Sequence, residues 1–307
     1  MRGRALAAAG WVLCGGCTQL APPAVSARAI VGGTATTGDP AVVALIAQVP
    51  GAALATLCTA TIVSPHVVLT AAHCVSPDAV GATAKFRVGL APNLDTARAK
   101  DFVDVTEVHY HPDFSLSKVT GGNDIAVAIV GSPLAPKPIA MNQSALSSSL
   151  VGQPARMVGY GKTAGSDTSG ASAGLRREAD TVMGAYDDKL VRFGVAGTTT
   201  CEGDSGGPGL MTIAGQEVIV GVVSFGDQDC AMLDADTRVD RYVDDWIRPY
   251  VDDADPGFFT PLPTKDSGCA MATGAFPSPF GATLVFALGA LALRRRRRDY
   301  LTTTLSK

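Results

Sequence analysis

The sequence predicts an all-β protein, a barrel or sandwich of many short strands with one helix near the C-terminal end. Three observations predict this class. Runs rich in Val, Ile and Thr recur along residues 30–239, and this composition favours strands. Gly, Pro, Asn and Asp separate the runs, as expected where a chain turns back after each strand. No helical period lies between them, which argues against alternating helices and strands.

The expected strands follow one another at short intervals. They cover residues 41–49, 59–63, 67–70, 86–90, 103–110, 125–130, 155–160, 218–225 and 237–239. A helix is then expected over residues 239–249, because apolar side chains recur at intervals of three and four residues from Val239 to Tyr250. Pro249 is expected to end this helix, since the residue before a proline disfavours helical backbone.

Composition and charge narrow the class of protein. Of the 307 residues, 47% are hydrophobic and 17% are charged, which excludes a disordered chain or a coiled coil. Residues 30–268 carry 16 Lys and Arg against 27 Asp and Glu, a balance of −11. An acidic body repels phosphate groups, so no nucleic-acid partner is expected.

Residues 1–29 have the layout of an export signal peptide. Two arginines open the segment, residues 5–13 form a short apolar stretch, and residues 27–29 form a small-x-small cleavage site. Cys14 and Cys17 leave a lipoprotein signal as the alternative, although the residues before each match such a signal poorly.

The C-terminal end combines segments with the composition of a linker, a targeting or anchoring signal and a short tail. Residues 252–279, rich in Asp, Pro, Gly and Thr, are expected to form a linker. Residues 280–298 join an apolar run to five arginines, and residues 299–307 would be a cytoplasmic tail. The apolar run is shorter than the roughly 20 residues that span a bilayer. With Cys269 before it, this layout resembles the MYXO-CTERM sorting signals of myxobacterial surface proteins. The resemblance implies removal of the tail near Cys269 and a lipid anchor on that cysteine, with a plain tail anchor as the alternative.

Four of the seven cysteines lie in the body of the chain, namely Cys58, Cys74, Cys201 and Cys230. An even number of cysteines in an exported chain favours disulfide bonds. Four cysteines allow three pairings, and the residues alone do not choose among them. No Cys-x-x-Cys spacing with histidines indicates a zinc site.

Three short segments carry reactive side chains. His73 follows an apolar strand, Asp124 opens another strand, and Ser205 lies in the Gly-rich turn of residues 201–208. A serine hydroxyl needs a neighbouring base to act as a nucleophile, histidine suits that role, and a carboxylate fixes the histidine tautomer. Each segment alone is compatible with an ordinary turn or a packed side chain. All three in this order indicate nucleophilic catalysis.

These segments, with residues 30–33 and 158–161, closely resemble the chymotrypsin/trypsin family of serine proteases. The order His, Asp, Ser also matches this family. The resemblance implies a protease domain of residues 30–251 with two perpendicular, antiparallel, six-stranded β-barrels. One barrel would cover residues 30–140 and the other residues 141–238, with the active site between them.

The resemblance also implies a role for each matched residue. His73 would be the general base and then the general acid, Asp124 would orient it, and Ser205 would attack the scissile carbonyl to form an acyl-enzyme. The amides of Gly203 and Ser205 would form the oxyanion hole. The cysteine spacings match the family as well and imply the disulfides Cys58–Cys74 and Cys201–Cys230.

Activation in this family depends on a new amino terminus. A freed isoleucine pairs with the aspartate before the serine, here Ile30 with Asp204. Family precursors usually have Arg or Lys directly before the isoleucine, but this chain has Ala29. We therefore expect signal cleavage after Ala29 to expose Ile30 without a separate propeptide. The alternative is that Ile30 only begins a first strand.

Four residues are placed by the resemblance at the pocket that selects the substrate side chain. Thr199 at its base is neutral, where trypsin-like members have Asp. Ser224 and Gly226 match the strand that pairs with the substrate backbone, and Asp234 lies on the wall, where the family usually has Gly. These residues predict a broad or small-to-medium apolar preference rather than strict cleavage after Arg or Lys.

No cofactor and no metal are expected. The segment that matches the family's calcium loop offers only Asp95 and Asp101 as acidic ligands, which are too few for a hard cation. The expected partners are protein or peptide substrates and protein inhibitors, the expected location is secreted or anchored at the cell surface or outer envelope, and a monomer is expected. The alternative function is a non-catalytic binding protein on the same scaffold. An esterase fits less well, because its serine elbow belongs to an alternating helix–strand fold.

Overall fold

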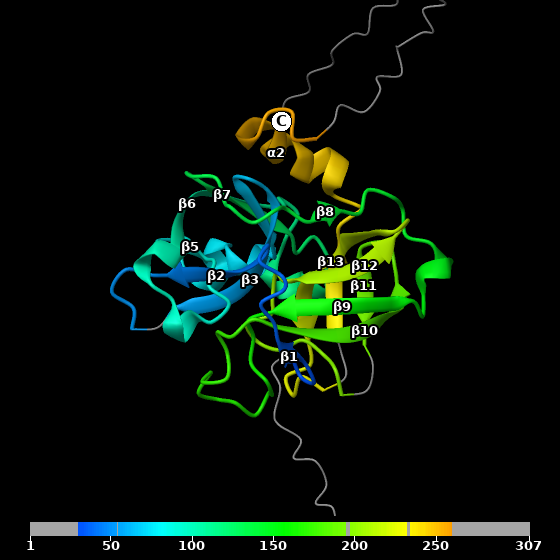
Figure 1. Ribbon diagram of the computed structural model, residues 1–307, viewed down its shortest axis with the longest axis horizontal. Coiled ribbons are helices and arrows are strands. Elements are labelled where there is room, and N and C mark those ends of the chain that lie inside the picture. Colours follow the sequence, from blue (N-terminus) through cyan, green and yellow to red (C-terminus); the bar gives the residue numbers. More distant parts are fainter. Residues whose placement is uncertain (1–29, 54, 195–196, 232–233, 260–307) are drawn as a thin grey trace, which may run out of the picture. The chain divides into compact units, whose positions relative to one another are not determined.

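Two β-barrels make up most of the described chain (Figure 1). The computed structural model describes residues 30–53, 55–194, 197–231 and 234–259. All of these residues belong to one compact unit, Met1–Pro261. The expected export signal, most of the linker, the segment of residues 280–298 and Cys269 lie outside the described residues.

The first barrel is a closed antiparallel ring in the order β2-β3-β4-β7-β6-β5. Its strands are β2 (Val42–Gln48), β3 (Thr56–Ser64), β4 (Val67–Thr70), β5 (Lys85–Gly89), β6 (Phe102–Tyr110) and β7 (Ala126–Val130). Because β4 is paired with β3 on one side and β7 on the other, all four of its residues are buried. The histidine segment follows this central strand directly.

The second barrel is closed by the pairing of β9 with β10. Its strands are β9 (Pro154–Gly159), β10 (Arg177–Tyr186), β11 (Leu190–Phe193), β12 (Pro208–Ile213), β13 (Gln216–Gly226) and β14 (Asp234–Arg238). Two short strands are added outside the ring, β1 (Thr34–Ala35) on β10 and β8 (Ala140–Met141) on β13. The expected architecture of two antiparallel six-stranded barrels is therefore confirmed.

Three strands of the second barrel were not expected from the sequence. β10 contains charged residues and Gly184 among its apolar residues, β11 has four residues, and β12 begins directly after the Gly-rich serine turn. None of them shows a clear β-branched run. Pairing with neighbours on both sides, rather than local propensity, makes these segments strands.

The C-terminal helix differs from its predicted bounds. A π-helical turn, η6 (Val243–Ile247), leads into α2 (Arg248–Ala254), so the helix begins later than residue 239 and includes the first three residues of the expected linker. Pro249 does not end the helix. It lies in the first turn of α2, where its missing N–H is not needed. No helix among the described residues is long and apolar enough to cross a membrane.

The remaining helical segments are short and connect strands. They are η1 (Ala72–Cys74), α1 (Pro77–Val80), η2 (Leu94–Thr96), η3 (Ala99–Asp101), η4 (Leu116–Gly121) and η5 (Ser148–Leu150). Among them, η1 follows β4 and contains His73.

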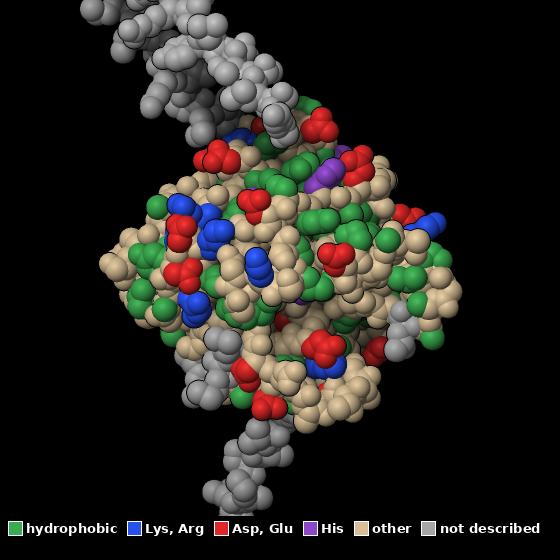
Figure 2. All heavy atoms as spheres, turned by 180° about the vertical axis from the view of Figure 1, so that it is seen from behind, with side chains coloured by type: hydrophobic (Ala, Val, Ile, Leu, Met, Phe, Trp, Pro, Cys, Tyr) green, Lys and Arg blue, Asp and Glu red, His purple; other side chains and the backbone are tan. Residues whose placement is uncertain are grey.

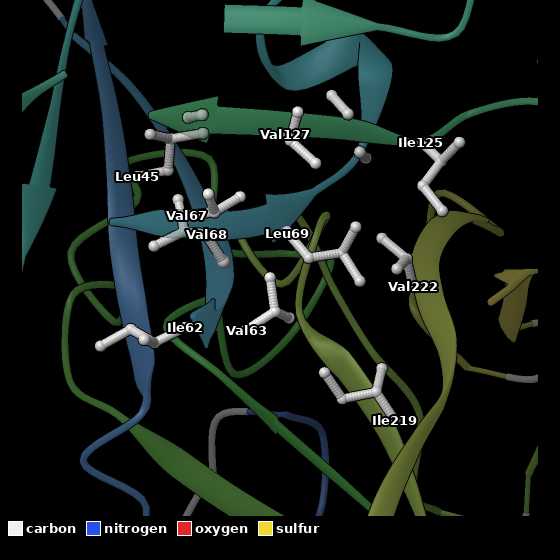
Figure 3. Packing of buried hydrophobic residues seen from close by; sticks show 14 of the residues in the cluster. Leu45, Ile62, Val63, Val67, Val68, Leu69, Ile125, Val127, Ile219 and Val222 are labelled. Carbon is white, nitrogen blue, oxygen red and sulfur yellow. The ribbon is translucent and has the colours of Figure 1, made fainter. Parts of the chain in front are cut away.

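The larger hydrophobic cluster joins the two barrels. Figure 3 shows Leu69 of β4 and Ile125 beside Val222 of β13, and Ile219 of β13 belongs to the same cluster. A second hydrophobic cluster lies in the second barrel and includes the fully buried Ile30. The shared cluster fixes the strand ends of one barrel against those of the other, and this contact places the candidate site.

Candidate active site

The His73 and Asp124 side chains form a paired arrangement. The Asp124 carboxylate accepts hydrogen bonds from the His73 backbone N–H at 2.9 Å and lies 2.7 Å from His73 Nδ1. The Ser224 hydroxyl donates a third hydrogen bond to Asp124 at 2.6 Å. Asp124 is fully buried, whereas the His73 side chain is 21% exposed. The pair therefore combines a shielded carboxylate with an imidazole that solvent or substrate can reach.

The backbone before Asp124 is held in an uncommon conformation. Asn123 has a φ of 64°, a region that asparagine tolerates better than most residues. The Tyr242 hydroxyl donates to Asn123 Oδ1 at 2.9 Å, and Asn123 Nδ2 donates to the Asp113 carbonyl at 3.3 Å. These bonds fix the turn that points Asp124 into the molecule.

The Ser205 turn packs against the histidine segment. The Ser205 carbonyl accepts a hydrogen bond from the Thr59 amide at 2.8 Å. A Cβ atom on Gly206 would lie 2.1 Å from Thr70 Oγ1, and the φ of this glycine is 84°. Only glycine fits so close to the strand that ends just before His73. The two barrels thus bring Ser205 to the segment that carries His73.

The Ser205 hydroxyl makes no hydrogen bond to His73 within the described residues. In enzymes without bound substrate, such bonds are often long and tighten in the complex. The structure therefore brings His73 and Asp124 into direct contact and brings Ser205 to them through its backbone.

The backbone around Ser205 leaves two donors available. Gly203 has a φ of 102°, and its carbonyl accepts from Thr59 Oγ1 at 2.9 Å. The amides of Gly206 and Gly207 are used by the Val223 and Asp204 carbonyls. Within the described chain, no protein acceptor takes the amides of Gly203 or Ser205. Free amides in a fixed turn are the donors that an oxyanion requires.

Asp204 is buried beside the Ser205 turn, and no cationic side chain among the described residues is bound to it. Its carboxylate accepts from the amides of Gly161 at 2.7 Å and Cys201 at 3.0 Å. The pKa of Asp204 is raised to about 7, mainly by burial and in part by the charge of Asp234, while the two amides and the charge of Arg177 oppose the rise. The described contacts of Asp204 do not include Ile30, whose nitrogen is in peptide linkage with Ala29.

A cavity of about 400 Å³ opens beside Ser205. Ser224 and Gly226 line it, as do Thr200 and both cysteines of the Cys201–Cys230 disulfide. Thr199 and Asp234 are buried and lie outside its described lining. Two of the four expected pocket residues therefore face the cavity, and two lie behind it.

Both disulfides implied by the resemblance are present. Cys58–Cys74 ties β3 to the end of η1 beside His73, and Cys201–Cys230 joins two segments of the cavity wall. Among the described residues, the potential metal-ligating atoms that lie close together belong to Cys58, His73 and Cys74. Those sulfur atoms are bonded to each other, so they offer no thiolate to a metal.

Sequence reasoning missed Thr59 and Thr200. Thr59 contacts Gly203, Ser205 and Tyr160 through its amide and hydroxyl, which links the first barrel to the Ser205 turn of the second. The only local signal was a threonine next to Cys58 in a buried strand. Thr200 lines the cavity next to the predicted Thr199, and one residue along an irregular turn decides which of the two side chains faces it.

Comparison with known proteins agrees with this geometry. The trypsin family matches residues 30–247. The chain is 30% identical over 269 residues to alkaline trypsin A of Manduca sexta, covering 74% of this chain and 93% of that protein. It is 28% identical over 213 residues to human kallikrein-11, covering 62% of this chain and 71% of the relative.

A third relative is longer than this chain. The match to CLIP domain-containing serine protease B4 of Anopheles gambiae is 27% identical over 223 residues. It covers 62% of this chain and 61% of that protease. The chain thus spans about three fifths of the length of this relative.

Proposed function

Because the chain belongs to the trypsin family, we propose that it is a serine endopeptidase that hydrolyses peptide bonds through an acyl-enzyme intermediate. One observation carries the proposal. A fully buried Asp124 binds both the backbone N–H and Nδ1 of His73, in a segment that packs against the Ser205 turn. The cavity beside Ser205 is the natural place for a substrate side chain.

The proposed chemistry follows from the proton positions. Asp124 holds the proton on Nδ1 of His73, which leaves the Nε2 lone pair as the base. Ser205 Oγ attacks the peptide carbonyl carbon and gives its proton to Nε2, and the oxyanion accepts hydrogen bonds from the amides of Gly203 and Ser205. His73 then protonates the leaving amine. Water repeats the sequence on the acyl-enzyme, releasing the acid and restoring Ser205.

Formation of the active state would require a freed Ile30. A new ammonium at this residue would give buried Asp204 the cationic partner that it lacks in the uncut chain, and an unpaired buried charge is costly. Ile30 has a φ of 36°, which is strained for a β-branched residue. A cut before Ile30 abolishes that dihedral angle, so cleavage after Ala29 would relieve strain and supply the ammonium together.

Export and anchoring complete the proposed function. Residues 1–29 would direct export, the part of residues 252–279 beyond α2 would act as a linker, and residues 280–298 with Cys269 would anchor or sort the protein. The two disulfides support an oxidising compartment. On the face shown in Figure 2, acidic and basic side chains are interspersed, which suits peptide substrates better than a nucleic acid.

Covalent labelling tests the proposed enzyme. We expect a fluorophosphonate probe to label the secreted protein, and Ser205→Ala to remove both labelling and peptide hydrolysis. Ser147→Ala, at an exposed serine far along the chain from the site, is the matched control and should label like the parent. A parent protein that binds peptides but takes no label would instead indicate a non-catalytic binding protein.

Sequencing the amino terminus tests the proposed activation. The labelled protein should begin at Ile30. A fully active protein that begins at Ser26 or further upstream would contradict the pairing of Ile30 with Asp204.

A further inference from the structure

Two buried carboxyl groups lie behind the cavity beside Ser205. Asp234 and Asp236 are two residues apart on β14, so their side chains project from the same face of the strand. They are 2% and 0% exposed. Thr200, which lines the cavity, donates its hydroxyl hydrogen to Asp234 Oδ1 at 2.7 Å. The proposed catalytic steps use neither carboxyl group.

Asp236 occupies a space that two glycines leave open. A Cβ atom on Gly209 or on Gly221 would lie 2.7 Å from Asp236 Oδ2. Within the described residues, no N–H or hydroxyl donates to either oxygen of Asp236. The polar group that it faces is the Asp234 carboxyl. The barrel interior thus makes room for a carboxyl group without supplying a donor to it.

Two facing carboxyl groups with this environment hold a proton between them. Burial raises the pKa of both groups, and the charge of Asp234 raises the pKa of Asp236 further, whereas the Thr200 hydroxyl favours the charged form of Asp234. Like charges this close cannot both ionise without a large cost. A proton on one group is also the missing donor for the other.

Among the described residues, the surrounding elements supply no cation bound to the pair. The residues around Asp236 are apolar or glycine, namely Val191 and Phe193 of β11, Gly209 of β12, and Gly221 and Val223 of β13. The charged group nearest along the serine segment is Asp204, itself acidic and influenced by Arg177 of β10.

The nearest arginines on the same strands are engaged elsewhere. Arg192 of β11 binds Asp187 and Arg238 of β14 binds Asp240. Glu202, which lines the cavity, pairs with Lys162. Among the described residues, no Lys or Arg forms an ion pair with Asp234 or Asp236.

We infer that Asp234 and Asp236 share one proton behind Thr200, and that loss of this proton switches the cavity from accepting neutral side chains to favouring cationic ones of the same length. The inference rests on the proposed endopeptidase function. A substrate ammonium would donate to the Thr200 oxygen, whose own hydrogen is directed to Asp234, and it would supply the cation that the pair lacks. Thr199 alone predicts an apolar preference, and the acidic pair revises it.

The test compares two peptide p-nitroanilides that differ only in Lys or norleucine before the scissile bond. The ratio of their kcat/KM values cancels pH effects on the catalytic steps, because both substrates pass through the same steps. Lysine stays charged to about pH 9, since its pKa is near 10.4. We expect the Lys/norleucine ratio to rise about tenfold or more between pH 6 and pH 9 as the pair loses its proton.

Three variants identify the source of the switch. Asp234→Asn should give a low ratio at both pH values. Asp236→Asn places an amide donor beside Asp234, so the high ratio should already be present at pH 6. Thr200→Val keeps the shape of the side chain but removes the hydroxyl between Asp234 and the substrate ammonium, so it should lower the ratio at pH 9. A purely structural role would change both substrates equally and leave the ratio unaltered.

The possible failures are distinguishable. A protein that labels with fluorophosphonate but shows a pH-independent ratio, or cleaves neither substrate, would overturn the acidic switch alone. A protein that neither labels nor hydrolyses any peptide would overturn the proposed function and the switch with it. Should Asp236→Asn not fold, the parent ratio and Thr200→Val decide the matter.

Discussion

In both the His73–Asp124 pair and the His66–Asp255 pair, one carboxylate binds the backbone N–H and Nδ1 of a histidine. The distances are 2.9 and 2.7 Å in the first pair and 2.8 and 2.6 Å in the second. The exposed fractions of the histidine side chains are also similar, 21% and 29%. By the geometry of the pair alone, the two cannot be told apart.

Their surroundings separate them. Asp124 is fully buried and receives an additional hydrogen bond from Ser224, and the Ser205 turn with its free amides lies beside His73. Asp255 is 11% exposed and lies just after α2. The hydroxyl of Ser64, close enough to Asp255 to favour its charged form, is buried and without a hydrogen-bond partner of good geometry. Because it is buried, the Ser64 hydroxyl cannot reach a substrate.

A histidine–aspartate pair with this geometry can therefore hold two segments of the chain together as well as orient a catalytic base. In the first pair, the proposed role of the aspartate is to orient a base toward the Ser205 nucleophile. In the second it holds the β3–β4 turn to the end of the last helix, across 189 residues of sequence. What faces the other imidazole nitrogen decides which role the pair has.

The largest expected difference between the pairs is in catalysis. Asp124→Asn should lower kcat by about 10⁴-fold, because the amide favours the wrong histidine tautomer. Asp255→Asn should leave kcat within about twofold, as expected for a substitution away from the reacting groups. Steady-state hydrolysis by both variants, each checked for folding by circular dichroism, measures the contrast. Equal losses of activity would mean that the second pair also serves the site.

The Ser224 hydrogen bond should account for part of that contrast. Ser224→Ala removes a donor from a buried carboxylate, and hydrogen bonds to charged groups contribute roughly 1.5–3 kcal/mol. We expect kcat/KM to fall about ten- to hundredfold, less than for Asp124→Asn. Ser224→Ala should lower kcat/KM by a smaller factor in the Asp124→Asn background than in the parent. If the losses in kcat/KM from the two substitutions are fully additive, a shared role of Ser224 and Asp124 is contradicted.

In the second pair the expected effect is on stability. Asp255→Asn weakens the contacts between His66 and the end of α2, so the free energy of unfolding should fall by about 1–2 kcal/mol. Urea denaturation followed by tryptophan fluorescence is a suitable measurement, since Trp246 lies in η6. Asp253→Asn, at an exposed position on the same helix, is the matched control and should show no comparable loss.

The pH dependence of that stability should be the smallest effect. Burial raises the pKa of Asp255, but the nearby Ser64 hydroxyl and the hydrogen bonds from His66 outweigh burial and hold the pKa below its ordinary value. A lowered folded pKa stabilises the fold above about pH 4, the unfolded pKa, and this stabilisation is lost as pH falls through the folded pKa. The stability gap between the parent and Asp255→Asn should therefore narrow below about pH 4. A gap that stays constant from pH 7 to pH 3 would argue against this titration.

Local pattern predicted much of the fold but not the second barrel's weaker strands. Runs such as β2 and β7 are rich in Val and Ile, and their bounds were predicted to within one residue. β10 and β12 form because neighbouring strands pair with them. The helix end was mispredicted because Pro249 blocks a helix interior but not a first turn.

The reactive groups could be identified without coordinates, since His73, Asp124, Ser205 and the four cysteines lie in short segments that are recognisable from their neighbouring residues. The two barrels could be predicted as well, through resemblance to a family with that fold. Which polar groups meet across the chain became visible only in the folded molecule. Asp255 reaches His66, Thr59 reaches the serine turn, and Thr200 rather than Thr199 lines the cavity in front of Asp234. Such contacts depend on strand register and on packing between barrels, and no local stretch of sequence encodes either.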